Sequence, residues 1–294
     1  MQEQGHVQNF LLSSFDHSNQ KPLENFINLQ HNIVYSCSDQ NIMSAEHYFP
    51  EHALGIMLSG DAQYFTNEGT FVMKAGAICL MRRNHLFRKM KTLGENGEAI
   101  ALISLFLDQE SLHEYARENS IPKQDAYKGL PMINLSGNAF LRGFFDSLRP
   151  YIDHPGKLSA KLAELKTSEA IELLLQTGGV MSNFLFDFQE AHKIDLEAYM
   201  NHNYKFNIPV SSFAKLTGRS LSTFKRDFTR IFGTTPEKWL QQKRLEQAHY
   251  LISKKNQRPS EVYLEVGFEN LSHFSFAFKK LFGHAPTKLA AQQL

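Results

Sequence analysis

Cysteine is scarce in this 294-residue sequence, where it occurs only as Cys37 and Cys79. A disulfide framework needs several paired cysteines, so a fold that depends on one is excluded, and no Cys-x-x-Cys pair is present. Both cysteines fall within short apolar runs that are typical of strands, where single thiols are usually buried. We therefore expect two free cysteines in a packed interior.

Long apolar runs are missing too. The longest, AIALISLFL over residues 99–107, is about half the ~20 residues that a membrane-spanning helix needs. The chain also opens without the charged and then apolar segment of a secretion signal. We expect a cytoplasmic protein that does not enter a membrane. Its length and its 42% hydrophobic residues suffice for two packed domains.

The chain has little net charge, because its 31 Lys and Arg residues are nearly balanced by 30 Asp and Glu residues. The balance nevertheless changes along the chain. Residues 190–294 contain 16 basic and 9 acidic residues, a net charge of +7, which leaves −6 for residues 1–189. This division predicts a basic domain with a polyanionic partner, joined to an acidic domain without one.

Motifs of the common enzyme classes are absent. The sequence has no phosphate-binding glycine loop and no nucleophile elbow, and HEYAR at His113 has Arg117 where a zinc-protease helix needs its second histidine. His47, His52 and His85 do not form the His-x-His pair that would indicate a metal site on a barrel. We therefore predict no catalytic residue, no bound metal and no cofactor.

The first part of the chain divides by its sequence pattern. Residues 1–31 are polar and lack clear periodicity, so we expect an N-terminal arm. Residues 32–107 alternate short β-like runs, such as HALGIMLSG and GTFVMKAG, with closely spaced turns, which is typical of an antiparallel sandwich or small barrel. The apolar residues of these runs are most simply core, although a small barrel can also hold one ligand.

Residues 108–189 change to a helical period. KLSAKLAELKTSEAIELLLQT carries Leu158, Leu162, Leu165, Ile171 and Leu174 on one broad face, and two shorter helices are predicted before it. We expect this region to be a packing or dimerisation element. The alternative is that the neighbouring β domain covers the apolar face.

One phrase occurs twice in the last third of the chain. LSTFKRDFTRIFGTTP begins at Leu221, and LSHFSFAFKKLFGHAP begins fifty residues later at Leu271. The matching apolar positions predict one buried stripe on each of two helices. They are Leu221, Phe224, Phe228, Ile231 and Phe232 in the first copy, and Leu271, Phe274, Phe278, Leu281 and Phe282 in the second.

Each copy has the boundaries of a helix, because Ser220 and Asn270 are suited to cap the first turn and Gly233 and Gly283 to end the last. A shorter amphipathic segment ending in glycine precedes each copy, PVSSFAKLTG or PSEVYLEVG, so the chain contains two helix-turn-helix motifs. Residues 236–253 between them predict one helix of about 27 Å at ~1.5 Å per residue. Such a rod could hold two recognition helices about one DNA turn, ~34 Å, apart in successive major grooves.

Residues 192–290 resemble the AraC/XylS family of bacterial transcription regulators, in the motifs FKRDFTRIFGTTP, RLEQAHYLI and EVGFENLSHFSFAFKKLFGHAP. The β-rich first part resembles, less specifically, the cupin-like sensing domain common in that family. The resemblance implies an α+β fold: an antiparallel cupin-like β-barrel over residues 32–107, helices over 108–189, and an all-α DNA-binding domain over 190–294. It also implies promoter DNA and RNA polymerase as partners, a homodimer, and a small-molecule or protein effector at the first domain.

The first recognition helix leaves five polar residues toward solvent when its stripe is buried. The family resemblance places base reading at Ser222, Lys225 and Arg226, and Lys or Arg suits the O6 and N7 acceptors of guanine. Thr223 and Thr229 complete the exposed set.

The second recognition helix departs from the family pattern, because Phe276 stands where an arginine is common. We expect Phe276 to pack against protein rather than to touch a thymine methyl group, and base reading by this motif to be weaker. Much of its binding energy should then come from salt-dependent backbone contacts. The polar candidates are Asn270, Ser272, His273 and Ser275, with Lys279 and Lys280 better placed for phosphate.

The predicted function is sequence-specific regulation of transcription, with activation as the usual role in the family. One alternative is a small-molecule or metal-binding barrel protein with residual DNA binding. Another is a regulator that a partner protein controls through the barrel. Specific binding to duplex DNA distinguishes the first hypothesis from the barrel protein.

Overall fold

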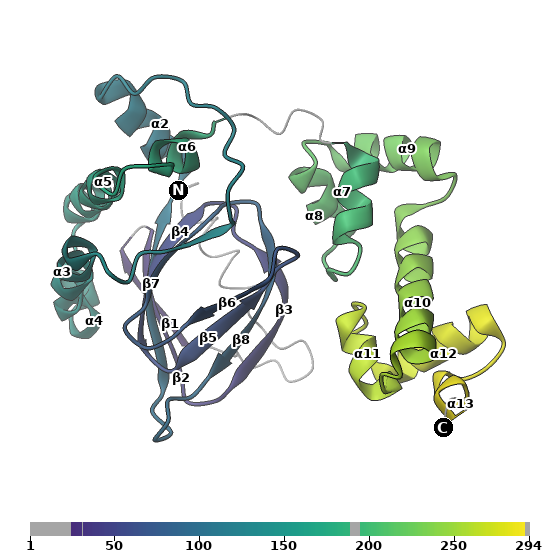
Figure 1. The fold of residues 1–294 in the computed structure, drawn as a ribbon. Helices are drawn as coiled ribbons and strands as arrows, with labels where there is room; N and C mark the ends of the chain where they lie inside the picture. Colours follow the sequence, from purple (N-terminus) through teal and green to yellow (C-terminus); the bar gives the residue numbers. More distant parts are fainter. Residues whose placement is uncertain (1–24, 31, 189–194, 292–294) are drawn as a thin grey trace. The chain divides into compact units, whose positions relative to one another are not determined.

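The computed structural model describes residues 25–30, 32–188 and 195–291, except for the side chains of residues 25–28, 30 and 43–47. Its contacts divide the chain into two units, residues 1–189 and 190–294, and each is described by itself. The described part of the first unit contains two antiparallel sheets and several helices, and that of the second contains only helices (Figure 1). Within these residues, no helix combines the length and apolar character needed to cross a membrane.

Two sheets form the first unit, and every strand pairing in them is antiparallel. In spatial order the larger sheet contains β1 (Asn25–Gln30), β2 (Ile33–Ser38), β9 (Ile100–Leu107), β4 (His52–Ser59), β7 (Ile78–Met81) and β10 (Met132–Asn134). The smaller contains β3 (Ile42–Tyr48), β8 (Leu86–Thr92), β5 (Asp61–Phe65) and β6 (Thr70–Met73).

The larger sheet is buried on both faces. Along β4, Leu54 and Ile56 face the helices, while Ala53 faces the smaller sheet. β9 alternates in the same way, which explains why its sequence is a nearly continuous apolar run. Cys79 lies in the core between the sheets and Cys37 is half-buried. Both are free thiols, as expected.

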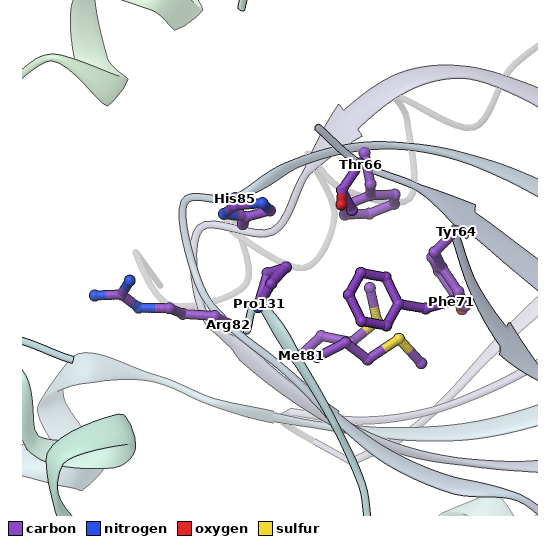
Figure 2. Close-up of a pocket in the computed structure, with 9 residues that line it drawn as sticks. Tyr64, Thr66, Phe71, Met81, Arg82, His85 and Pro131 are labelled. Atoms are coloured by element: carbon purple, nitrogen blue, oxygen red, sulfur yellow. The ribbon is translucent and has the colours of Figure 1, made fainter. Parts of the chain in front are cut away.

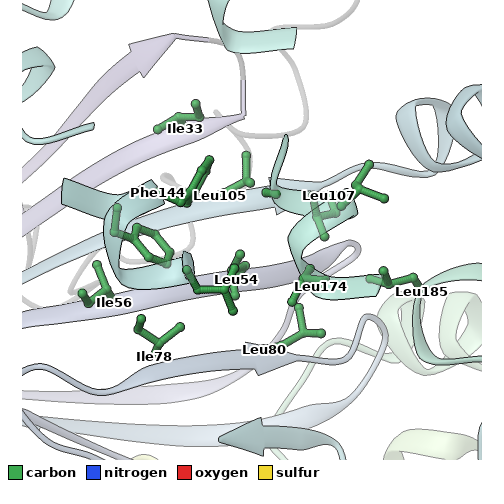
Figure 3. Packing of buried hydrophobic residues seen from close by; sticks show 14 of the residues in the cluster. Ile33, Leu54, Ile56, Ile78, Leu80, Leu105, Leu107, Phe144, Leu174 and Leu185 are labelled. Atoms are coloured by element: carbon green, nitrogen blue, oxygen red, sulfur yellow. The ribbon is translucent and has the colours of Figure 1, made fainter. Parts of the chain in front are cut away.

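Helices cover the outer face of the larger sheet. Figure 3 shows Phe144, Leu174 and Leu185 from three helices packed over Leu54 and its neighbouring strand residues. The alternative that the β domain covers the helical apolar face is therefore correct for most of that face. The helices of this unit are α2 (Gln109–Glu118), α3 (Ala139–Leu148), α4 (Pro150–Asp153), the short 3-10 helix η1 (Pro155–Lys157), α5 (Ala160–Leu175) and α6 (Met181–Phe186).

Part of the predicted face of α5 is wrong. Leu162 and Leu165 are 40% and 55% exposed, whereas Ala163, Thr167 and Ala170 are buried with the predicted Ile171 and Leu174. The buried stripe of α5 is thus rotated toward its small residues, because small side chains let a helix approach a sheet closely.

The β region extends beyond the predicted residues 32–107 at both ends. The expected arm is wrong for Asn25–Gln30, which forms β1, an edge strand paired only with β2. Half of its residues are polar, so its sequence only weakly indicates a β-strand. Met132–Asn134 forms β10 within the region predicted to be helical, and its three residues are too few to show alternation. The rest of the predicted arm, residues 1–24 and 31, lies outside the described residues.

The second unit contains seven helices among its described residues, and five of them, α8 to α12, are the two motifs and the connecting helix that the repeat predicts. They are α7 (Leu196–Asn203), α8 (Val210–Leu216), α9 (Leu221–Phe232), α10 (Pro236–Lys255), α11 (Pro259–Glu265), α12 (Leu271–Phe282) and α13 (Pro286–Ala291). α9 and α12 lie near opposite ends of the long α10 (Figure 1). The coarse fold prediction, antiparallel sheets followed by a helical domain, is confirmed.

Candidate nucleic-acid interface

The first helix-turn-helix motif consists of α8, a turn at Gly218 and α9. Gly218 has φ +67°, a left-handed conformation that glycine adopts without strain. The hydroxyl of Ser220 accepts a hydrogen bond from the backbone N–H of Thr223 and so caps α9. Gly233 ends α9 with φ +68°. The predicted caps are confirmed.

A buried ion pair holds the turn of this motif against α9. Arg219 Nε lies 3.3 Å from Asp227 Oδ2, and both side chains are at most 10% exposed. Arg219 Nη1 also donates to the carbonyl of Thr217 at 2.8 Å. Because the turn cannot move without breaking these bonds, the exposed face of α9 has a defined orientation.

Four of the five candidates on α9 are exposed, namely Ser222, Lys225, Arg226 and Thr229, and Thr223 is half-buried. The Thr223 hydroxyl accepts a hydrogen bond from Ser220 at 3.0 Å, so this residue belongs to the cap as well. The Arg226 side chain is 76% exposed.

Lys225 pairs with a carboxylate at the start of α10. Its Nζ lies 3.2 Å from Glu237 Oε1, and both side chains are about half exposed. A hydrogen bond from the backbone N–H of Glu237 itself, together with Lys225, holds the pKa of this carboxyl below its usual range. An exposed pair of this kind contributes little to stability, so breaking it costs little free energy.

The second motif consists of α11, a turn at Gly267 and α12. Asn270 Oδ1 accepts hydrogen bonds from the backbone N–H groups of Ser272 and His273 at 2.8 and 3.1 Å. This oxygen is therefore engaged as a helix cap. Of the other polar candidates, Ser272, His273, Lys279 and Lys280 are exposed and Ser275 is half-buried.

Phe276 is 70% exposed, and the prediction that it packs against protein is wrong. The apolar stripe of α12 is filled by Phe274 and Phe278, which are fully buried, and Phe276 lies off that stripe.

The buried stripes are also shorter than predicted, because their outer members are 40–45% exposed. These residues belong to the first and last turns of twelve-residue helices. They are Leu221 and Ile231 on α9, and Leu271 and Leu281 on α12.

Arg244 of α10 joins the second motif to the segment between α7 and α8. Its guanidinium donates to the carbonyls of Tyr204 and Phe206 before the first motif, at 2.9 Å each, and to that of Gly267 in the second at 3.2 Å. It also donates to Asn207 Oδ1 at 3.1 Å. Neither the contacts of Arg244 nor the Arg219–Asp227 pair were predicted from the sequence. The available signal was a charged residue within the otherwise apolar face of a predicted helix.

Two of the histidines weighed as metal ligands, His52 and His85, contact other protein groups. His52 is buried, its Nδ1 accepts from the backbone N–H of Arg83 at 3.3 Å, and burial holds its pKa well below its usual range. His85 Nε2 lies 2.8 Å from Glu68 Oε2. The His47 side chain lies outside the described residues. Across the described chain, no three His, Cys, Asp or Glu side chains are grouped in a way that could hold a metal ion.

A small pocket lies in the first unit, with room for little more than a water molecule. Figure 2 shows the rings of Tyr64 and Phe71 on one side and the guanidinium of Arg82 pointing away from them. Arg82 Nη2 instead lies 2.8 Å from Asp187 Oδ2. The remaining lining residues are Thr66, Met81, His85, Phe87, Pro131 and Met132.

Two family models match the chain, one in each unit. The model described as an ExsA N-terminal regulatory domain matches residues 52–182. The model described as a helix-turn-helix domain matches residues 213–292.

Several curated proteins are similar over most of the chain. The HTH-type transcriptional regulator ExsA of Pseudomonas aeruginosa is 23% identical over 81% of this chain and 85% of its own length. The thermoregulatory protein LcrF of Yersinia pestis is 23% identical over 81% of this chain and 88% of its own. The HTH-type transcriptional activator RhaS of Pectobacterium carotovorum is 21% identical over 84% of this chain and 88% of its own length.

Solved structures are similar as well. Wild-type ToxT from Vibrio cholerae, with an unsaturated fatty acid bound, covers 91% of this chain and 96% of its own at 12% identity and a TM-score of 0.38. An AraC-type DNA-binding domain from Chromobacterium violaceum covers 34% of this chain and 89% of its own at 25% identity and a TM-score of 0.31.

Proposed function

Because the chain belongs to the AraC/XylS family of DNA-binding transcription regulators, we propose that it activates promoters by inserting α9 and α12 into two successive major grooves. One observation carries this proposal: both recognition helices present exposed polar and basic residues, and both are held on the single helix α10. Its 20 residues span about 30 Å at ~1.5 Å per residue, close to one DNA turn of ~34 Å.

Base reading in the first groove is assigned to Ser222, Lys225 and Arg226, with Thr223 and Thr229 at its border. In the second groove the polar contacts come from Asn270, Ser272, His273 and Ser275, and Lys279 and Lys280 bind phosphate. Thr223 and Asn270 take part in the helix caps, which leaves the Thr223 hydroxyl proton and the Asn270 Nδ2 amide able to donate to DNA.

Replacing Arg226 with alanine is expected to relax one position of the DNA motif. A bidentate guanine contact is worth about 1–3 kcal/mol, so affinity for the preferred base should fall about 5- to 150-fold, with little change for the other three bases. The measurement is selection of duplexes from a random pool at a stated salt concentration, followed by titration of single-base variants.

Arg230→Ala is the matched control, because Arg230 is on the same helix and its side chain is also 76% exposed. It should weaken binding to all sequences alike, as loss of a phosphate contact does. A motif that stays unchanged in Arg226→Ala would remove this residue from base reading. Failure to enrich any motif with the unmodified protein would contradict the proposed function itself.

Two copies of the chain are proposed to associate through the exposed apolar side chains of α3 and α5. Phe140, Leu162 and Leu165 are 74%, 40% and 55% exposed. Near them α5 carries both Lys161 and Glu164, so an antiparallel copy of the helix would meet charges of opposite sign.

Replacing Leu165 with glutamate is expected to shift the protein from dimer to monomer in sedimentation experiments, because it places a charge within the apolar contact. Leu130→Glu is the control, since Leu130 is 56% exposed but does not belong to α3 or α5. Equal sedimentation of both variants and the unmodified protein would argue against this surface.

The first unit is proposed to be a cupin-like barrel, and regulation is proposed to act through it. The effector is proposed to be a small molecule or a partner protein, and the pocket in Figure 2 has room for little more than a water molecule. RNA polymerase and promoter DNA are the partners proposed in the cytoplasm. The proposal includes no cofactor and no catalysis by this chain.

A further inference from the structure

Phe276 occupies on α12 the place that Arg226 occupies on α9. The two helices have twelve residues each, both begin after a capping side chain, and both end at a left-handed glycine. Each of these two residues is the sixth of its helix. If both helices enter major grooves in the same manner, Phe276 meets the bases where Arg226 meets them in the first half-site.

The exposure of Phe276 is unlike that of its neighbours. Its side chain is 70% exposed, whereas Phe274 and Phe278 are fully buried. Ser272 lies four residues before it and Lys279 three after, so all three share one helix face. An exposed phenyl ring adds little to the stability of the folded unit, since stabilisation comes from the apolar area removed from water. Its presence among polar and basic residues therefore indicates a contact made on binding.

The chemistry of the groove limits what a phenyl ring can recognise. Phenylalanine has no hydrogen-bond donor for guanine O6 and N7. The one apolar group on a base edge in the major groove of unmodified DNA is the C5-methyl of thymine. Resting on the proposed function, we infer that Phe276 reads a thymine through this methyl group, while Lys279 and Lys280 hold the adjacent phosphates. The two half-sites then differ in chemistry, with a cation reading the first and an apolar ring reading the second.

The test replaces thymine by deoxyuridine, which lacks only the C5-methyl group. Each thymine of the selected duplex is replaced in turn, and affinity for the full chain is measured. The unmodified protein should lose about three- to tenfold affinity at one thymine in the half-site bound by α12. Phe276→Ala should bind the thymine and deoxyuridine duplexes equally. Arg226→Ala, the matched control, should keep the difference at that thymine although it binds more weakly.

Equal affinity of the unmodified protein for every deoxyuridine duplex would overturn the inference, and so would a difference that persists in Phe276→Ala. Normal DNA recognition by Phe276→Ala with loss of transcription activation would also overturn it, and would place a protein partner on this ring. Because Phe276 is exposed, the variant should unfold as the unmodified protein does. Enrichment of no duplex at all would instead contradict the proposed function.

Discussion

Gly267→Ala is expected to lower the free energy of unfolding of the helical unit by about 2–5 kcal/mol. Gly267 is buried in the turn of the second motif with φ +88°, a conformation that alanine adopts only with strain. A Cβ atom at this position would also lie 2.3 Å from the carbonyl oxygen of Lys205. Since that atom belongs to backbone, the turn and the segment before α8 would have to separate.

Gly283→Ala separates the two causes, because Gly283 has φ +78° but its added Cβ would meet no atom within 4 Å. This substitution should lower the free energy of unfolding by about 1–2 kcal/mol, from the strained backbone conformation alone. Unfolding in urea is followed by the fluorescence of Trp239, the one tryptophan of the sequence, which packs against Phe228 and Phe232 in this unit. Equal midpoints for the two variants would show that the turn accommodates the extra atom.

Arg244→Met is expected to lower the free energy of unfolding by about 3 kcal/mol or more, measured by the same urea unfolding. Methionine keeps much of the length of the side chain but donates no hydrogen bond, so three backbone carbonyls and the Asn207 oxygen lose their charged donor. An acceptor left without its partner in a partly buried site costs about 1–3 kcal/mol. The loss also frees the second motif from the segment before the first, so specific DNA affinity should fall with stability.

Arg230→Met is the control for removal of an arginine. The Arg230 side chain is 76% exposed and its nearest carboxylate oxygen, on Asp227, lies 3.7 Å away. An exposed pair of this kind contributes about 0–1 kcal/mol. An Arg244→Met protein that unfolds at the same urea concentration as Arg230→Met would refute the proposed role of Arg244 as the link between the second motif and the segment before α8.

Local sequence rules predicted the helical unit well. The caps at Ser220 and Asn270 and the left-handed ends at Gly233 and Gly283 depend only on residues within one turn of the chain. The β region was predicted less completely at its margins, since β1 is a polar edge strand and β10 has three residues. Neither leaves a pattern that alternation can detect.

Side-chain exposure was predicted less well than helix position. Periodicity indicates which residues can share a face, but whether a neighbour covers that face depends on contacts between distant segments. Periodicity therefore grouped Leu162 and Leu165 with residues that the sheet covers, although both are exposed, and it placed Phe276 wrongly against protein. On α5, close packing on the larger sheet selects Ala163 and Ala170 for burial instead.

By itself, the sequence determined that two helix-turn-helix motifs follow a β-rich domain, because caps, glycines and a 3.6-residue period act over short distances. Only the tertiary structure decided which of their residues reach solvent and how the motifs are joined. The joint depends on one side chain, Arg244, meeting backbone carbonyls 23 to 40 residues away. Backbone carbonyls are the same in every residue, so no sequence pattern identifies the partners of such a hydrogen bond.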